Sequence, residues 1–418
     1  MTAPSSPLRL RLVAPLAGLT LFALFAALYL GDRDLYVRIM GLWGVPAYRY
    51  PFLDWEGASA FIECWRRGID VYVSDPCDVR GQVFNYSPLW LEARFVPFGP
   101  FWRNATGVGM AVTFFASLYL VFRPKSWGDT ALFTLASLST AVAYGVERAN
   151  LDLMLFVMIV AAGVLAAGRL GQRWLAYGLI LLAGLFKFYP LAALLTAVRE
   201  RLAIFVGVAA LAGAGLCIFV WTYRSQLAAL QSNIPGGRYG HDAFGAANLL
   251  YLLPISSEAV RLALLATLAM CAFAMAVSIA REGGFARAFA AIGLSEQSLL
   301  VLGAAVIVGC FFAGQSILYR GVFLAPVVAG LIAMRRASDE AHVRRRLAWL
   351  TGVALLLMWE GAWDPVPGDS PAKTLYLIPE VMWWWVVASL TAVLLVWVAQ
   401  SPALADLRRI FRPREARA

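Results

Sequence analysis

Several charged side chains lie in or beside strongly apolar segments of this chain, among them Asp54, Glu56, Arg148, Lys187 and Arg320. An ionised group at membrane depth is costly and is a functional candidate by default. A carboxylate can take the proton from an attacking hydroxyl, and cations can stabilise a departing phosphate. These residue types therefore suit transfer of a group from a phosphate-bearing donor to a hydroxyl acceptor, with Asp54 as the base and Glu56 as the second choice.

Asp54 opens an amphipathic stretch, Asp54–Arg67, which carries Trp55 and Phe61 on its apolar side. A helix of this kind is expected to lie along a membrane interface. Asp54 then stands where it can meet a substrate at the membrane surface. The alternative is that Asp54 is only the N-cap of that helix.

Two further basic residues stand at ends of apolar runs. Lys187 precedes Tyr189 and Pro190 where proline interrupts a short span, and broken helices mark ligand sites in membrane proteins. Arg320 can grip a phosphate with two hydrogen bonds. We assign Lys187, Tyr189 and Arg320 to the donor phosphate. The alternatives are a lysine that snorkels to the interface and an ordinary interfacial arginine.

The run 147–152 joins two apolar segments and contains Arg148 and Asn150. In a structural interpretation, Glu147 pairs with Arg148 and Asn150 caps the following helix. In a functional interpretation, both residues face a polar cavity that opens outward. We assign Arg148 to phosphate binding and Asn150 to substrate binding.

The composition indicates an all-α, polytopic integral membrane protein. Hydrophobic residues make up 61% and charged residues 14% of the chain, against about 25% charged in soluble domains. Runs of about 20 apolar residues cross a bilayer as helices. The predicted spans are Leu10–Leu30, Thr106–Phe122, Thr130–Tyr144, Leu151–Ala167, Trp174–Phe188, Leu202–Trp221, Ala259–Ala280, Ser298–Ala313, Ile317–Met334, Leu347–Trp359 and Tyr376–Val398.

The distribution of basic residues predicts the orientation of these spans. Positive charge gathers on the cytoplasmic side, so Arg9, Arg11 and the basic tail 402–418 place both termini in the cytoplasm. An even number of crossings is then required, and the short broken segment Tyr189–Val198 supplies the twelfth. The expected location is the inner membrane. This orientation also explains the net charge of +10, so no nucleic-acid partner is implied.

We expect one membrane domain, 1–418, with two non-cytoplasmic loops at 31–105 and 223–257. The first loop is rich in aromatic residues and carries Cys64 and Cys77, which an oxidising compartment would let pair. We predict a Cys64–Cys77 disulfide, with free thiols as the alternative. A metal site at this pair would need further Cys or His nearby, so no metal is expected.

At these residues the chain resembles the GT-C superfamily of integral-membrane glycosyltransferases, and more narrowly the polyprenyl-phosphate-mannose-dependent mannosyltransferase-like family. The shared features are Asp54 after the first span, Asn85 and Tyr86 in a run resembling the family's Tyr-Pro-Pro segment, Asn150 opening a span, and Lys187 in Lys-Phe-Tyr-Pro. The resemblance covers most of the chain in layout, and the Lys-x-Tyr-Pro match is its best motif.

The resemblance implies a GT-C-like fold with interfacial helices in the first outer loop. It also implies an inverting, metal-independent transfer of a sugar, without a cofactor. The donor would be a polyprenyl-phosphate-linked sugar, with Asp54 as the base and Lys187 near the donor phosphate, and the acceptor a lipid or glycan. Two departures leave the sugar and the acceptor open. Glu147 to Ala149 stand where the family has Gly-Gln-x before its Asn, and Ser87 replaces the first proline.

Two other classes of function fit the same composition. The charged residues could line the path of a transporter or flippase of lipid-linked sugar, or the chain could be a structural membrane partner without catalysis. Transporters often show inverted repeats and polar residues near the midplane. No repeat is visible here and the polar groups crowd one face, which favours the enzyme. In the second loop, His241 is a candidate for acceptor binding, and a plain surface position is the alternative.

Overall fold

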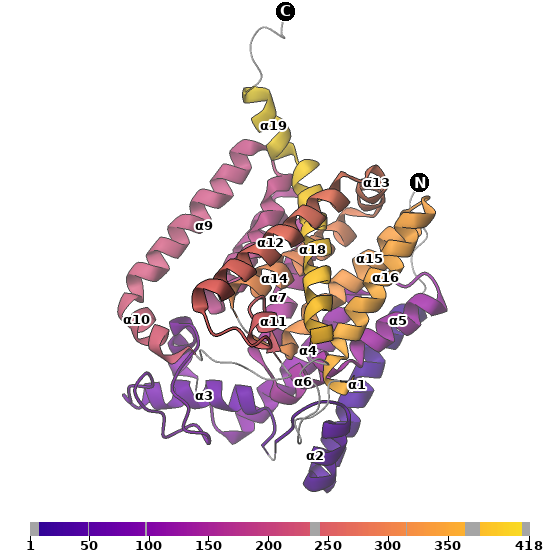
Figure 1. The fold of residues 1–418 in the computed structure, drawn as a ribbon. Coiled ribbons are helices and arrows are strands. Elements are labelled where there is room, and N and C mark those ends of the chain that lie inside the picture. Colours follow the sequence, from indigo (N-terminus) through magenta and orange to yellow (C-terminus); the bar gives the residue numbers. More distant parts are fainter. Residues whose placement is uncertain are drawn as a thin grey trace, which may run out of the picture.

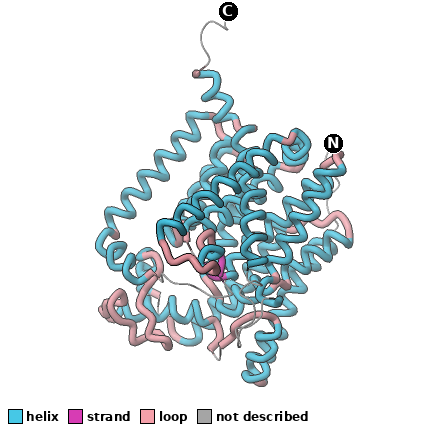
Figure 2. Tube along the Cα trace, in the orientation of Figure 1, coloured by secondary structure: helices cyan, strands magenta, loops and turns pink. Residues whose placement is uncertain are grey.

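The computed structural model describes residues 8–48, 50–96, 98–234, 243–314, 316–363 and 377–411. Helices make up most of this part of the chain (Figures 1 and 2). Two short strands, β1 (Ala243–Phe244) and β2 (Ser316–Ile317), pair antiparallel with Ala243 opposite Ile317. The predicted all-α membrane class is confirmed by these helices and their apolar composition.

Seven helices of the described chain are long and apolar enough to cross a bilayer. They are α1 (Leu8–Gly31), α4 (Pro100–Val121), α9 (Leu202–Thr222), α12 (Glu258–Arg281), α14 (Leu294–Ala313), the continuous pair η3 (Leu318–Phe323) and α15 (Leu324–Ala337), and α18 (Leu377–Ala399). A pair bent by 114°, α6 (Thr140–Arg148) and α7 (Leu151–Ala166), adds an eighth if it counts as one span. The count of about twelve crossings is not confirmed and stays a prediction.

Burial divides these helices into a centre and a periphery. In α14, η3–α15 and α18, 72%, 83% and 67% of the apolar window is buried, whereas α1, α9 and α12 bury only 17%, 17% and 11%. Apolar helices that leave most of their side chains uncovered require lipid around them. α9 stands apart at the left edge of the molecule in Figure 1, as this burial requires.

Shorter helices fill the space between the long ones. They are α5 (Trp127–Ser137), α8 (Leu170–Phe186), the 3₁₀-helix η2 (Tyr189–Arg199), α13 (Gly283–Ala291), α16 (Ala341–Met358) and α17 (Glu360–Trp363). The predicted span 130–144 is divided, because α5 ends at Ser137 and the Ser139 hydroxyl caps α6 by accepting the Val142 N–H. The short segment η2 packs against α8 and α14, with Ala193 and Thr196 fully buried. η2 therefore packs against protein. A broken helix too short to cross a bilayer requires such contacts, because lipid cannot satisfy its backbone polar groups.

The predicted outer loop 31–105 lies at one end of the bundle, and the start of α1 lies at the other end with α19 (Pro402–Ile410) (Figure 1). We call the first of these ends the outer end, after the predicted orientation. It carries α2 (Arg33–Leu42), α3 (Leu53–Arg66) and the 3₁₀-helix η1 (Pro88–Phe95), with α10 (Arg224–Asn233) beside them. The short helix α11 (Asn248–Tyr251) lies in the predicted second loop. At the outer end, α3 lies across the bundle rather than along it (Figure 1).

The outer segment, by which we mean the described part of residues 31–105, has a hydrophobic core of its own. Trp55, Phe61 and Ile62 of α3 pack with Val71 and Phe84 of the following loop. Cys64 and Cys77 are joined by a disulfide, which ties the end of α3 to that loop. Because side chains and a covalent link both hold this segment, it is a built platform rather than a loose connection.

Candidate functional site

Asp54 lies in the first turn of α3 and points toward the bundle. The residue at the N-cap is Phe52, in the left-handed conformation with φ 56°, so the interpretation of Asp54 as the cap is wrong. The Phe52 N–H donates to the Glu147 carbonyl oxygen at 3.1 Å, and the Phe52 ring lies so close to Gly107 that a methyl group there would clash. These contacts fix where α3 begins, and the Asp54 carboxylate takes no part in the cap. The side chain is 13% exposed.

Asn150 connects Asp54 to the interior of the bundle. Its side-chain N–H donates to Asp54 Oδ2 at 2.6 Å, while its Oδ1 accepts the Asp152 backbone N–H at 2.9 Å as the N-cap of α7. The same oxygen accepts from Lys187 Nζ at 3.4 Å. The capping bond requires the amide oxygen on that side, so the amide nitrogen must face Asp54. Asn150 is thus both the predicted cap and a polar bridge.

Asp152 is the centre of the charged cluster, and the sequence interpretation gave it no role. Its Oδ1 lies 2.5 Å from Lys187 Nζ and accepts the Tyr189 hydroxyl at 2.9 Å, and its Oδ2 lies 3.5 Å from Arg320 Nε. The side chain is 1% exposed. Two cations against one carboxylate leave a local net charge of +1. A carboxylate in the first turn of an apolar helix was the available signal.

Three interruptions of the helical chain bring this cluster together. The α6–α7 bend passes through Ala149 at φ 41° and places Asn150 at the start of α7. The end of α8, shortly before Pro190, places Lys187 at the C-cap of that helix. The 3₁₀-helix η3 places Arg320, whose guanidinium lies 4.7 Å from the centre of the Tyr189 ring. Ends of helices expose polar groups, so they are where such a cluster can be built.

Arg148 contacts one carboxylate oxygen of Asp54, and Asn150 bonds to the other. Arg148 Nη1 is 3.6 Å from Asp54 Oδ1, its Nε is 3.0 Å from Glu147 Oε2, and its Nη2 donates to the Pro46 carbonyl at 3.0 Å. Arg80, from the outer segment, adds a second cation at 3.9 Å from Asp54. The predicted convergence of Arg148, Lys187 and Arg320 therefore takes the form of two groups: Arg148 with Asp54, and the other two with Asp152.

Glu56, the second-choice base, points to a different partner. It forms an ion pair with Arg103 of α4 at 3.0 Å. Burial raises the pKa of Glu56, and the charge of Arg103 partly opposes this. Positions two apart on a helix face different sides, so Glu56 does not share the Asn150 contact of Asp54.

Three residues predicted to bind substrate remain: Asn85, Tyr86 and His241. Tyr86 lies beside the cluster, with Lys187 Nζ 5.8 Å from the centre of its ring, and burial raises its pKa, with a further increase from the charge of Asp54. Asn85 precedes it and is half-buried. His241 lies outside the described residues.

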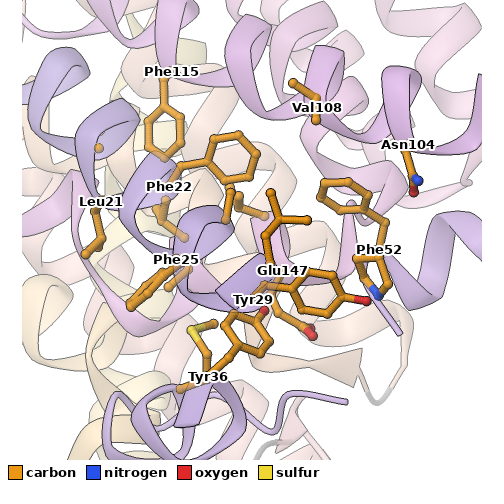
Figure 3. A pocket seen from close by; sticks show the side chains of 18 of the residues that line it. Leu21, Phe22, Phe25, Tyr29, Tyr36, Phe52, Asn104, Val108, Phe115 and Glu147 are labelled. Atoms are coloured by element: carbon orange, nitrogen blue, oxygen red, sulfur yellow. The ribbon is translucent and has the colours of Figure 1, made fainter. Parts of the chain in front are cut away.

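An apolar cavity of about 240 Å³ has Pro51 and Phe52 among its lining residues, just before Asp54 in the sequence. Figure 3 shows Phe22 and Phe25 of α1 on one side of the pocket and Phe52 on the other, with Tyr29 and Glu147 between them. Helices α1 and α4 meet at Gly18, where an added methyl group would clash with the Phe115 ring. Glu147 is the only charged residue among its described lining residues. The cavity therefore suits a hydrocarbon chain rather than a phosphate.

The part of the chain that the structure describes has one cluster with the residue types of a metal site. Ligand atoms of Cys64, Asp75 and Cys77 lie within 4.8 Å of one another. The two sulfurs are joined in a disulfide, so they are not thiolate ligands here.

Comparison with protein-family models, with curated proteins and with solved structures finds no match to this chain.

Proposed function

We propose that this protein is a GT-C-type membrane glycosyltransferase. It would move a sugar from a polyprenyl-phosphate donor to a lipid or glycan acceptor on the non-cytoplasmic face, with inversion. The observation that carries the proposal is the Asn150 bridge, in which one amide contacts Asp54 at 2.6 Å and Lys187 at 3.4 Å. Asp54, the proposed base, and Lys187, the proposed phosphate-binding cation, therefore contact the same side chain. A displacement at a sugar carbon between the two groups requires them to be held in fixed positions close to each other.

In the proposed step, the acceptor hydroxyl oxygen forms a bond to the anomeric carbon of the donor sugar as the bond from that carbon to the phosphate oxygen breaks. Asp54 takes the hydroxyl proton, and the polyprenyl phosphate leaves with the electron pair. Positively charged groups preorganised around a leaving phosphate lower the barrier. Lys187 and Arg320 supply that charge, because together they exceed the charge of Asp152 by one.

The apolar cavity beside Phe52 supports a lipid substrate. Its wall follows one face of α1, with Phe22, Phe25 and Tyr29 at helical spacing, and Phe52, two residues before Asp54 in the sequence, is also among its lining residues (Figure 3). Since its charged residue is Glu147 and no cation is among its described lining residues, a chain there fits a lipid with an uncharged head. In this proposal the cavity serves the acceptor, and the donor phosphate lies at Lys187 and Arg320.

The test is sugar transfer by the purified full-length protein in proteoliposomes that contain polyprenyl-phosphate sugars and a membrane glycolipid extract. Asp54→Asn keeps the shape of the side chain and removes the base, so we expect transfer to fall by about 10²- to 10⁴-fold. The matched control is Glu92→Gln, an exposed carboxylate at the same end of the molecule, which should transfer at the wild-type rate.

Transfer that survives unchanged in Asp54→Asn would remove Asp54 from the role of base. Absence of transfer with every donor, together with movement of a lipid-linked sugar across the liposome membrane, would replace the enzyme by a transporter.

A further inference from the structure

A cavity of about 560 Å³ lies beside the start of α1, at the end of the bundle opposite α3 (Figure 1). We name it the inner basic cavity and define it by Arg11 at the start of α1, Arg123 and Lys125 after α4, Glu296 in the first turn of α14, and Arg336 in the last turn of α15. Its volume falls within the range of about 300–1,000 Å³ that is usual for small-molecule sites. The cavity therefore has room for a headgroup-sized ligand.

Among the described residues that define this cavity, cations outnumber carboxylates. Four cations line it against Glu296, and one further carboxylate, Asp129, is bonded to Arg336. The net charge of these six groups is +2. Two of the arginines donate to neutral oxygens: Arg123 Nη2 donates to Ser295 Oγ at 2.7 Å, and Arg11 Nη2 donates to the Tyr119 carbonyl at 2.8 Å.

The guanidinium groups of Arg11 and Arg123 are held in place rather than free in solvent. The Arg11 guanidinium lies 4.0 Å from the centre of the Tyr119 ring. Burial lowers the pKa of Arg123, Glu296 partly offsets this, and the charge of Arg11 lowers it further. Two fixed like charges beside one opening are costly to each other, and a bound anion would relieve that cost.

The surroundings of the cavity place it at the level of the membrane surface. Arg123 follows the last residue of α4 by two positions, and exposed apolar side chains stand next to the cavity residues: Trp127 is 67% exposed and Leu294 is 52% exposed. Tryptophan is enriched where membrane spans meet the headgroup region. A membrane lipid beside this cavity therefore has its headgroup at the level of the cavity residues.

We infer that the inner basic cavity binds the phosphate of an anionic membrane lipid, with the phosphate between Arg11, Arg123 and Lys125. Basic pockets between spans on the cytoplasmic side recognise acidic headgroups through the same chemistry. A free phosphate ion offers the same oxygens, and only the position at the membrane surface favours the lipid. The inference does not depend on the proposed transferase activity.

The test is native mass spectrometry of the full-length protein released from detergent, titrated separately with phosphatidylglycerol, phosphatidylcholine and inorganic phosphate. We expect retained phosphatidylglycerol adducts and weaker phosphatidylcholine adducts. The double variant Arg123→Gln with Lys125→Gln should weaken phosphatidylglycerol binding about 30-fold, since each basic residue near an anionic surface contributes about a fivefold factor.

The matched control is Arg335→Gln with Arg345→Gln, which removes two exposed charges from the same end of the molecule but outside the cavity. This pair should change binding less than twofold. Lys125→Gln alone, at an exposed position, should fold normally and lose about fivefold. Equal losses in both double variants, or equal affinity for the two lipids, would overturn the site. Inorganic phosphate that displaces phosphatidylglycerol at millimolar concentration would overturn the lipid as its ligand.

Discussion

The two ends of this molecule handle charge in opposite ways. At the outer end, four carboxylates (Asp54, Asp78, Glu147 and Asp152) meet four cations (Arg80, Arg148, Lys187 and Arg320) within 4.0 Å contacts, so the cluster is neutral as a whole. At the inner end, the basic cavity keeps a net charge of +2. The first arrangement is mostly buried, whereas Lys125 and Arg336 of the second are exposed.

The difference separates charges that hold the structure from charges that await a ligand. A buried ion pair contributes little net stability, yet loss of one partner is strongly destabilising because the other charge remains buried. Surface charges contribute little to folding and can be left unbalanced for a partner. We therefore expect the outer cluster to fix the geometry of the proposed active site and the inner basic cavity to determine the affinity for an anionic lipid. The following changes test that distinction.

The largest effect is expected from Asp152→Asn. It leaves Lys187 and Arg320 beside a neutral amide in a site where the native side chain is 1% exposed, so we expect a loss of about 3–5 kcal/mol in the free energy of unfolding. Thermal unfolding in detergent measures it. The corresponding change at the inner end, Glu296→Gln, should cost less than about 1 kcal/mol. Equal losses would end the distinction between the two ends.

A smaller effect separates the two roles of Asn150. Asn150→Ser keeps an N-cap acceptor but is too short to reach Asp54, whereas Asn150→Ala loses both contacts. Transfer should fall by about 10-fold or more in both variants, because a hydrogen bond to a charged group is lost. Only the alanine variant should also lose the cap, at about 1 kcal/mol of stability. A serine variant with wild-type transfer would leave Asn150 as a cap alone.

The smallest effect is expected from salt. Raising the ionic strength from about 0.1 M to about 1 M shortens the screening length from about 10 Å to about 3 Å. Lipid binding at the inner basic cavity should weaken, whereas the stability difference between wild type and Asp152→Asn should stay nearly constant because that cluster is buried. Paired titrations at the two salt concentrations measure both. A salt-sensitive Asp152 difference would mean that solvent reaches the outer cluster.

Most helices could be predicted from apolar runs, because a run of lipid-soluble residues has few alternatives to a helix. The break at Ser139 was missed, because Ser137, Ser139 and Thr140 are small residues inside an otherwise apolar run and nothing local shows that the Ser139 hydroxyl caps a new helix. Asp54, Asn150 and Lys187 could be selected from residue type and position. Asp152 could not be given a role, because a first-turn carboxylate is also an ordinary helix-start residue.

The sequence alone determined the membrane class, the apolar helices and the two charged ends, because hydropathy and charge are properties of local composition. Only the tertiary structure decided which charges meet. Lys187 and Asp152 are 35 positions apart, and Asp54 and Asn150 are 96 apart. No local pattern encodes those pairings, which arise where three helix breaks and the start of α3 come to one place. The outer segment became a platform through its own aromatic core and its disulfide.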